Sequence, residues 1–413
     1  MVSRRGFLVG AAATGGAAAA VAGGLSGCTE TAPPPFDPAD WGSVRGQFGL
    51  RRDLAQYAAF VLASHPRQVS DAIAEHRRGL DADPEGYLEQ RIERDRAART
   101  AVAGQLGVAP AEVALTNSTT HGLGLLYTGL RLDPGDEILT TEHDFYATHE
   151  SLRLRAERTG AVVRRVALYD DPARASTDRI VAALRDAVGP RTRVVALTWV
   201  HSGTGVKLPI RAIADALDGR ALLCVDGVHG FAAEDVDAAE LGCDVLISGC
   251  HKWLFGPRGT GFVWAKPAAW ERFTPVVPSF DADGRGPGPL ASPGGYQAYE
   301  HRWALPAAVE FHTAIGRHRI AARVHELARR LKEGLSTVDG LRLVTPMSAE
   351  LSAGIVCAEF ADLAASEAVA RLRGAGVSAS VTPYAKPYLR FGASIVTDEA
   401  DVEKTLAAVR NLR

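Results

Sequence analysis

The chain has 413 residues, enough for two or three domains at about 150 residues each. Hydrophobic residues make up 46% and charged residues 23%, which is typical of a globular protein and excludes a disordered chain, a collagen-like chain or a small disulfide scaffold. The formal net charge of −2 gives no basic footprint for nucleic acid, so a nucleic-acid partner is not expected.

Residues 1–27 have the features of an export signal. Arg4 and Arg5 precede an apolar run rich in Ala and Gly, which ends in small residues at Gly27. The paired arginines match the twin-arginine type of signal. A transmembrane helix is the alternative, but Gly and Ala are too weakly apolar to favour it. We therefore expect export by the twin-arginine route to a periplasmic or other extracytoplasmic location.

The end of this signal also predicts a lipid anchor. Leu25-Ser26-Gly27-Cys28 resembles a bacterial lipobox, in which Cys28 is acylated and becomes the first mature residue. Residues 28–40 contain three consecutive prolines and predict a stiff tether. We expect membrane contact through this anchor alone.

Short apolar strands alternate with helical stretches from about Ala58 onward. Strands are expected over residues 112–116, 136–141, 161–166, 193–198, 221–226, 244–248 and 261–264, and helices over residues 119–130, up to 158, and around 209–217. Such alternation predicts an α/β fold with a mostly parallel sheet covered on both faces, in a large domain over residues 41–295. Ligands bind at the carboxyl ends of the strands in such sheets.

The rest of the chain predicts a smaller α+β domain over residues 296–413. It follows a stretch rich in Gly and Pro, residues 281–295, which predicts a long loop. We expect a helix from Pro306 to about Leu335, strands near 340–344, 354–360 and 388–391, and helices around 366–373 and from Glu399.

Cysteine usage gives no sign of a metal site. Besides Cys28, the cysteines are Cys224, Cys243, Cys250 and Cys357, and none forms a CxxC pair. Each lies in or beside an apolar run, so we expect buried thiols, although an oxidising compartment would permit a disulfide.

Lysine is scarce, and one lysine has an unusual setting. Of the 46 basic side chains only six are lysines. Lys252 follows the expected strand over residues 244–248, where desolvation would lower its pKa and make it a nucleophilic amine able to form an imine. The alternative is an ordinary lysine whose ammonium group reaches solvent.

Asp226 ends an otherwise apolar strand, and His229 follows three residues later. A buried carboxylate is costly unless paired, and a pyridinium nitrogen is a suitable partner because a nearby anion keeps that nitrogen protonated. The alternative is an Asp that caps the next turn. His229 can donate a hydrogen bond to a phenolate oxygen, whereas a lone histidine more often has a structural role.

Asn117-Ser118-Thr119-Thr120 follows a strand and opens a helix. Hydroxyls and backbone N–H groups at a helix N-terminus suit a phosphate, whereas simple capping needs one hydroxyl. The chain contains no GxGxxG fingerprint and no P-loop, which disfavours an oxidoreductase with a Rossmann fold and an ATP enzyme.

The order of these groups along the chain resembles the class V aminotransferase family of fold-type I pyridoxal-phosphate enzymes. The resemblance runs from about Trp41 to the C-terminus and is closest to the isopenicillin N epimerase-like branch. Three segments carry it: Thr141-Glu142-His143-Asp144-Phe145-Tyr146-Ala147, His201-Ser202-Gly203-Thr204-Gly205, and His251-Lys252-Trp253-Leu254.

The resemblance implies pyridoxal 5′-phosphate as cofactor and a role for each matching residue. Lys252 would form the Schiff base, Asp226 would face the pyridine nitrogen, and His229 would lie near the phenolate oxygen. His143 would stack on the ring, with Phe145 as the alternative. The remaining contacts are implied for the phosphate (Thr119, Thr120 and His251), the ring or substrate (Ser202) and a substrate carboxylate (Arg390).

The chain departs from the family pattern at two places. Many relatives have Ser three residues before the lysine, whereas this chain has Gly249 there and Ser248, our candidate cofactor contact, one step earlier. Cysteine desulfurases of this class carry a nucleophilic Cys shortly before the carboxylate-binding arginine. Residues 376–383 contain none, so a desulfurase that uses such a thiol is not expected.

The shared chemistry is removal of a Cα proton from an amino acid or short peptide, with Lys252 as general base. Epimerisation, C–S lysis and transamination all remain open, with an isopenicillin N epimerase-like reaction favoured. The alternative from another class is an exported binding protein without turnover. The family also implies a homodimer, in which Gly294-Gly295 would reach the partner's phosphate.

Overall fold

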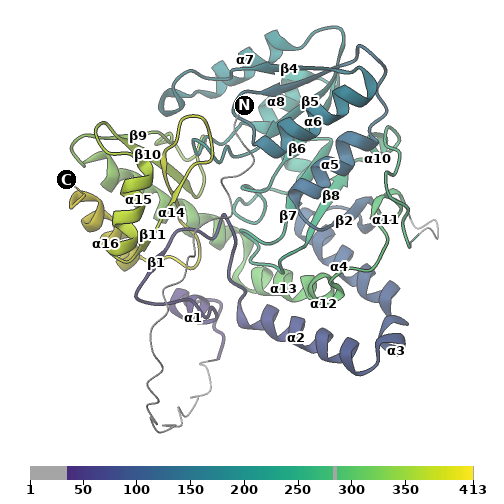
Figure 1. The fold of residues 1–413 in the computed structure, drawn as a ribbon, viewed down its shortest axis with the longest axis horizontal. Coiled ribbons are helices and arrows are strands. Elements are labelled where there is room, and N and C mark those ends of the chain that lie inside the picture. The colour runs from purple at the N-terminus through teal and green to yellow at the C-terminus, as the bar shows by residue number, and fades with distance from the viewer. Residues whose placement is uncertain (1–34, 282–285, 413) are drawn as a thin grey trace, which may run out of the picture. The chain divides into compact units, whose positions relative to one another are not determined.

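The structure is a computed structural model that describes residues 35–281 and 286–412 (Figure 1). The expected signal over residues 1–27, the lipidation site Cys28 and residues 28–34 of the expected tether lie outside the described residues. From Phe36 onward the chain forms one compact unit.

A seven-stranded sheet lies at the centre of this unit. Its strand order is β2-β8-β7-β6-β5-β3-β4. All neighbouring pairs from β7 to β4 are parallel, and β8 runs antiparallel to both β7 and β2. The strands are β2 (Val113–Thr116), β3 (Glu137–Thr141), β4 (Val162–Val166), β5 (Thr192–Thr198), β6 (Leu222–Asp226), β7 (Val245–Gly249) and β8 (Gly261–Ala265). The mostly parallel α/β sheet expected from the sequence is confirmed.

Alternate residues of each central strand enter two separate cores. In β6, Leu223 and Val225 pack on one face of the sheet, whereas Leu222 and Cys224 pack on the other. Because successive side chains of a strand point to opposite faces, an all-apolar strand is stable only when both faces are covered. The sheet therefore presents its polar groups at the strand ends, where the helices leave them accessible.

Helices cover both faces of this sheet (Figure 1). One face carries α5 and α6, and the other carries α4, α7, α8 and α13. The helices up to residue 315 are α1 (Trp41–Gly46), α2 (Arg67–Ala82), α3 (Pro84–Leu88), α4 (Arg91–Leu106), α5 (Thr119–Gly129), α6 (Tyr146–Thr159), α7 (Thr177–Ala187), α8 (Ile210–Leu217), α9 (Ala238–Leu241), α10 (Pro267–Trp270), α11 (Pro287–Ala291), α12 (Tyr299–Trp303) and α13 (Leu305–Ile315).

A second, antiparallel sheet has the order β12-β13-β10-β9, and a short parallel pair joins β1 to β11. Their elements, with the helices that pack around them, are β1 (Ala55–Gln56), β9 (Leu341–Leu343), β10 (Ile355–Phe360), β11 (Val377–Ser378), β12 (Ser380–Val381), β13 (Leu389–Gly392), α14 (Arg317–Ser336), α15 (Ala365–Gly374) and α16 (Glu399–Arg410). The boundary expected at residue 295 stays a prediction; α12 and α13, which follow it, pack on α2 and α4.

The structure corrects two expectations about local structure. The single helix expected from Pro306 to about Leu335 is two helices, α13 and α14, which are separated at Gly316. The φ of +95° at Gly316 lies outside the helical region, so the helix cannot continue through this residue. The loop expected over residues 281–295 contains the short helix α11, which begins at Pro287, a residue type suited to a first helical turn.

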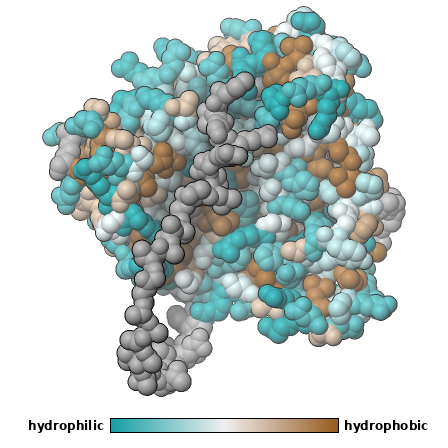
Figure 2. Space-filling model, in the orientation of Figure 1, coloured by the Kyte–Doolittle hydropathy of each residue, from teal (hydrophilic) through white to brown (hydrophobic). Residues whose placement is uncertain are grey.

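Two further findings concern the surface and the thiols. Within residues 35–281 and 286–412, no helix is both long and apolar enough to cross a bilayer. The face of the molecule drawn in Figure 2 is mostly hydrophilic, with separate hydrophobic patches. Cys224, Cys243, Cys250 and Cys357 are all buried free thiols, as expected from their apolar surroundings.

Candidate active site

The loops after β5, β6 and β7 meet at a cavity of about 360 Å³. This volume lies within the range of about 300–1,000 Å³ that is usual for small-molecule sites. Seven of the predicted site residues line it: Thr120, Ser202, Asp226, His229, His251, Lys252 and Arg390. The other lining residues are Phe60, Val61, Phe145, Tyr146, Thr198, Val228 and Pro383.

Lys252 places its amine inside this cavity. Its Nζ lies 3.4 Å from Nε2 of His229, and no carboxylate within the described part of the chain forms an ion pair with it. Burial lowers the pKa of Lys252, because a cation is poorly solvated there, while Asp226 partly opposes this effect. The amine is therefore neutral over a wider pH range than that of an ordinary lysine, so more of it is available near neutral pH to act as a nucleophile or to accept a proton.

Asp226 is the last residue of β6, and its side chain is 2% exposed. Its Oδ1 accepts a hydrogen bond from the backbone N–H of Val228 at 3.1 Å, the one hydrogen bond that reaches this carboxylate from the described residues. Burial raises the pKa of Asp226. A positively charged N–H partner would offset that cost, and a protonated ring nitrogen is such a partner.

The start of α5 and the turn after β7 form a second polar end of the cavity. Ser118 caps the helix by accepting from the N–H of His121, and Thr120 lines the cavity. Thr119 lies behind it, where its Oγ1 accepts from the backbone N–H of Gly249 at 2.8 Å. Ser248 does not line the cavity, because its hydroxyl donates to the carbonyl of Gly249.

Gly249 explains the first departure from the family pattern. A Cβ atom at this position would lie 2.6 Å from Cε1 and 2.9 Å from Nδ1 of His251, and 3.1 Å from Oγ1 of Thr119. The missing serine therefore makes room for the imidazole ring of His251, whose Nδ1 is buried and has no hydrogen-bond partner among the described residues. The ring occupies the space that the serine side chain would need.

Arg390 enters the cavity from β13 of the smaller sheet. Its Nη1 donates to the carbonyl oxygen of Ser202 at 2.9 Å, and its Nε donates to Oγ of Ser380 at 3.1 Å. The guanidinium lies 4.5 Å from the ring centroid of Phe60. No carboxylate in the described residues pairs with this 6% exposed cation, so it is suited to bind an anion that enters the cavity.

His143 and Phe145 take different directions after β3. His143 stacks on Tyr169, with the ring centroids 3.9 Å apart, and does not line the cavity, whereas Phe145 does. Asp144 fixes this turn, because its carboxylate accepts from Thr140 Oγ1 and from the N–H groups of Thr141 and Thr198. Phe145, the alternative named for ring stacking, is thus the residue at the cavity wall.

Three further residues of the site are not among those predicted from the sequence. Thr198 ends β5, and its buried Oγ1 lacks a hydrogen-bond partner among the described residues. Tyr384 lies just beyond Pro383, and its hydroxyl is 2.7 Å from Oγ of Ser202. Phe60 lies 53 positions before Val113, where the first strand of the large sheet begins. Thr198 ends an apolar strand, as Asp226 does, and that position is the signal that would have identified it.

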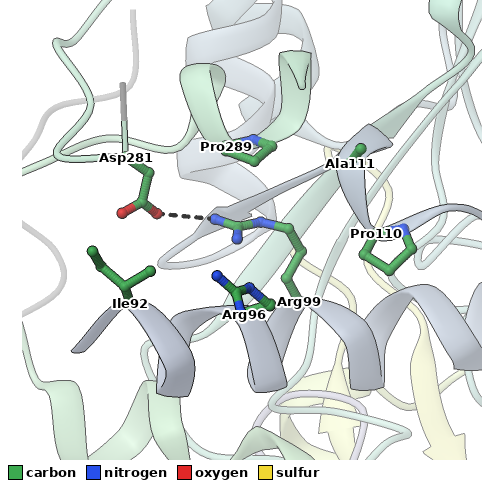
Figure 3. Close-up of a pocket in the computed structure, with 7 residues that line it drawn as sticks. All are labelled: Ile92, Arg96, Arg99, Pro110, Ala111, Asp281 and Pro289. Carbon is green, nitrogen blue, oxygen red and sulfur yellow. Dashed lines mark hydrogen bonds and ion pairs between the residues drawn. The ribbon is translucent and has the colours of Figure 1, made fainter. Parts of the chain in front are cut away.

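A second hollow, of about 170 Å³, lies between α4, the turn at Pro110 and α11 (Figure 3). Arg99 and Asp281 form an ion pair across it at 3.2 Å. It contains none of the predicted site residues. Among the described residues, no group of three or more His, Cys, Asp or Glu side chains could hold a metal ion.

Comparison with known proteins agrees with the arrangement of this site. Residues 63–381 match the aminotransferase class-V family. The chain belongs to this family. It is 28% identical over 394 residues to isopenicillin N epimerase of Streptomyces clavuligerus, which covers 90% of this chain and 98% of that relative. It is 30% identical over 330 residues to the isopenicillin N epimerase of Amycolatopsis lactamdurans (76% of this chain, 82% of the relative).

Other members of the family carry different names. A probable cysteine desulfurase of Vibrio cholerae is 26% identical over 327 residues, or 73% of this chain and 79% of the relative. The cystine C–S lyase C-DES, solved with cysteine persulfide, has a TM-score of 0.80 at 20% identity (87% of this chain, 98% of that chain). The desulfurase CsdA of Escherichia coli has a TM-score of 0.78 at 22% identity (90% and 97%). These structural matches establish the shared fold.

The cavity also fits the cofactor of the family, pyridoxal 5′-phosphate. The residues present include an amine for an aldehyde and a carboxylate for a ring nitrogen, at Lys252 and Asp226. The start of α5 and the unpartnered Nδ1 of His251 suit the phosphate group. Family and residue chemistry together identify this chain as a pyridoxal-phosphate-dependent enzyme. The individual roles of the site residues remain predictions.

Proposed function

We propose that this enzyme inverts the α-carbon of an amino acid, or of the amino-acid end of a short peptide. Two relatives named for that activity, the isopenicillin N epimerases, support this choice, and one of them aligns with 90% of the chain. Pyridoxal 5′-phosphate bound at Lys252 supplies the electron sink that makes the Cα proton acidic enough to remove.

The observation that carries the proposal concerns the residues next to Arg390. The segment over residues 376–384 contains no cysteine, and it contributes Pro383 to the cavity and the hydroxyl of Tyr384 to Ser202. Cys357 pairs with Arg390 across β10 and β13 but is fully buried, and burial raises the pKa of its thiol to about 12. A cysteine desulfurase needs an accessible thiolate, and neither this segment nor Cys357 provides one.

A reaction that inverts Cα needs one group to remove a proton and another to return one from the opposite side. Lys252 follows β7 and Ser202 follows β5, and β6, which carries Asp226, lies between these two strands. We assign proton removal to Lys252 and proton return to the hydroxyl pair of Ser202 and Tyr384. This arrangement has a proton-carrying group on each side of Asp226.

The proposed inversion returns every participating group to its starting protonation state. The Cα proton passes to Nζ of Lys252, the Ser202 hydroxyl proton passes to Cα from the other side, and Tyr384 returns a proton to Ser202. Tyr384 then recovers its proton from water, and Lys252 releases one. Burial raises the pKa of the Tyr384 phenol, while the hydrogen bond with Ser202 and the positive charge of Arg390 partly oppose this effect. Tyr384 therefore keeps its proton until Ser202 has given one up.

Arg390 would hold the substrate carboxylate during this exchange. Apolar side chains line much of the rest of the cavity, including Val61 and Tyr146, which are 51% and 66% exposed at its rim. We therefore propose a substrate that extends past Cα as an uncharged or apolar group toward this rim, as a short peptide would.

The test is chiral analysis of the product. The purified holoenzyme is incubated with single enantiomers of amino acids and of short peptides, and both configurations are quantified. The proposal predicts that each enantiomer, supplied alone, is converted in part into the opposite enantiomer. Formation of a keto acid would instead indicate transamination, release of a persulfide from cystine would indicate C–S lysis, and no turnover would indicate a binding protein.

We further propose that the enzyme is a homodimer. Tyr296 is 82% exposed and Phe280 is 52% exposed, and their rings lie 6.2 Å apart beside Gly294-Gly295. Gly294 is required locally, because a Cβ there would lie 2.7 Å from the carbonyl oxygen of Pro278. Light scattering on the full chain tests the dimer, and Tyr296→Asp should increase the monomer fraction.

Export by the twin-arginine route, with a lipid anchor at Cys28, completes the proposal. Its support is the sequence of residues 3–28. Fractionation of cells that express the full chain, with mass spectrometry of the mature N-terminus, tests it. An acylated Cys28 in the membrane fraction is expected, and Cys28→Ala should release the protein from that fraction.

A further inference from the structure

The ring of His229 lies between two nitrogen groups, one on each side. Its Nε2 is 3.4 Å from Nζ of Lys252, and its Nδ1 is 3.3 Å from Nε1 of Trp253. The imidazole is 5% exposed, so these two contacts determine where its proton resides. Lys252 lines the cavity, whereas Trp253 does not.

Trp253 permits one arrangement of protons on this ring. An indole N–H is a donor only, so Nδ1 of His229 must be the nitrogen without a proton. Burial, together with the nearby charges of Lys252 and Arg390, holds the pKa of His229 well below its ordinary value, so the ring is neutral. Its single proton then resides on Nε2.

We propose that Trp253 is a positioning residue that sets the Nε2–H tautomer of His229. This tautomer presents a donor to the lone pair of the Lys252 amine, which lines the cavity. With the proton on Nδ1, the donor would point away from the cavity, and Lys252 would face an acceptor instead.

The surroundings of Trp253 indicate why the indole stays in this orientation. Gly354 precedes β10, and a Cβ there would lie 2.5 Å from Cη2 and 2.7 Å from Cζ3 of Trp253. The indole is 3% exposed and occupies the space left by that glycine. It is thus held by the smaller sheet, to which Arg390 also belongs.

Few groups of the described residues face the ring of His229. Lys252 and Trp253 come from the turn after β7, Arg390 comes from β13, and His251 is the other titratable group whose charge acts on the ring. The ring of Phe60 meets it edge-on at 6.2 Å. Among these, Trp253 has the one contact with Nδ1, so a change at this residue alters Nδ1 selectively.

The test is ¹⁵N NMR of histidine-labelled protein without cofactor, which reads the tautomer independently of activity. In the wild type, Nε2 of His229 should be protonated and Nδ1 should resonate as a hydrogen-bonded acceptor. In Trp253→Phe, which keeps an aromatic ring but removes the N–H, the Nδ1 resonance should move to an unbonded position or the Nδ1–H form should appear. The assignment uses His229→Gln.

Trp270→Phe is the matched control. Its indole N–H also donates a hydrogen bond, at 2.9 Å to the carbonyl of Glu112, but this tryptophan lies on α10 and does not line the cavity. It should leave both resonances of His229 unchanged. With cofactor bound, Trp253→Phe should lower kcat more than it raises KM, and Trp270→Phe should change neither.

Two results would overturn the proposal. If Nδ1 of His229 carries the proton in the wild type, Trp253 cannot set the tautomer; this measurement does not depend on the variant folding. If Trp253→Phe folds and leaves both ring resonances unchanged, the indole contact has no effect on the ring.

Discussion

Arg390 donates a hydrogen bond from Nη1 to the carbonyl oxygen of Ser202, at 2.9 Å. This contact joins β13 of the smaller sheet to the loop that follows β5 of the larger one. It fixes the guanidinium at the cavity and also orients the residue whose hydroxyl meets Tyr384. One arginine therefore links the proposed carboxylate site to the proposed proton donor.

Arg390→Lys should weaken substrate binding. An ammonium group cannot reproduce the planar set of donors that reaches Ser202, Ser380 and a carboxylate at once. Loss of a charged hydrogen bond costs about 1.5–3 kcal/mol, so KM should rise about 10- to 100-fold. Steady-state kinetics check this. Arg329→Lys, at an exposed ion pair with Glu333, is the control and should leave KM unchanged, and an equal KM in both variants would contradict the assignment.

Gly249→Ser should destabilise the protein and weaken cofactor binding, although it restores a serine common in the family. The added Cβ would lie 2.6 Å from the His251 ring, and such overpacking typically costs about 1–3 kcal/mol. Denaturant unfolding and cofactor titration measure both effects. Gly104→Ser on α4, where a Cβ meets nothing within 4 Å, is the control. Tighter cofactor binding in Gly249→Ser would show that the serine is missing for another reason.

The rate of cofactor capture by the apoenzyme should depend on pH through Lys252. Burial lowers the pKa of this amine, so the neutral nucleophile is populated below the ordinary lysine pKa of about 10.4. The second-order rate of reconstitution should therefore rise with pH and level off well below that value. A rate that keeps rising tenfold per pH unit up to pH 10 would mean that the amine is an ordinary lysine.

Tyr384→Phe should separate inversion from proton exchange. The variant keeps the ring that packs against Gly203 but loses the hydroxyl that meets Ser202. Inversion should fall about 10²- to 10⁴-fold, the usual contribution of an acid–base group, while exchange of the Cα proton by Lys252 continues. Product chirality and deuterium content, measured on the same sample, check this. Tyr388→Phe is the control, and equal losses of inversion and exchange in Tyr384→Phe would contradict the role.

The sequence predicts the parts of this site that follow from strand ends. Asp226 and Lys252 are recognisable because each follows an apolar run that ends abruptly in a polar group. The sequence pattern does not show which of His143 and Phe145 lines the cavity. This choice depends on how Asp144 binds the N–H of Thr198, a residue 54 positions away, and such a contact leaves no local pattern.

Long-range contacts also account for the other differences. The hydroxyl of Tyr384 meets Ser202 across 182 positions of sequence, and Phe60 reaches Arg390 from the other end of the chain. The break between α13 and α14 is different in kind, because Gly316 was visible in the sequence. The apolar pattern continues on both sides of Gly316, so it does not indicate that the helix ends at this residue.

The most direct test of the central claim, that Lys252 removes the Cα proton for inversion, is turnover in deuterated water. Wild-type holoenzyme and Lys252→Ala, each supplied with cofactor, are incubated with a single enantiomer of the substrate. We predict deuterium at Cα in both configurations with the wild type and a loss of about 10²- to 10⁴-fold or more with Lys252→Ala. Undiminished exchange in Lys252→Ala, or a keto acid or persulfide as the sole wild-type product, would contradict it.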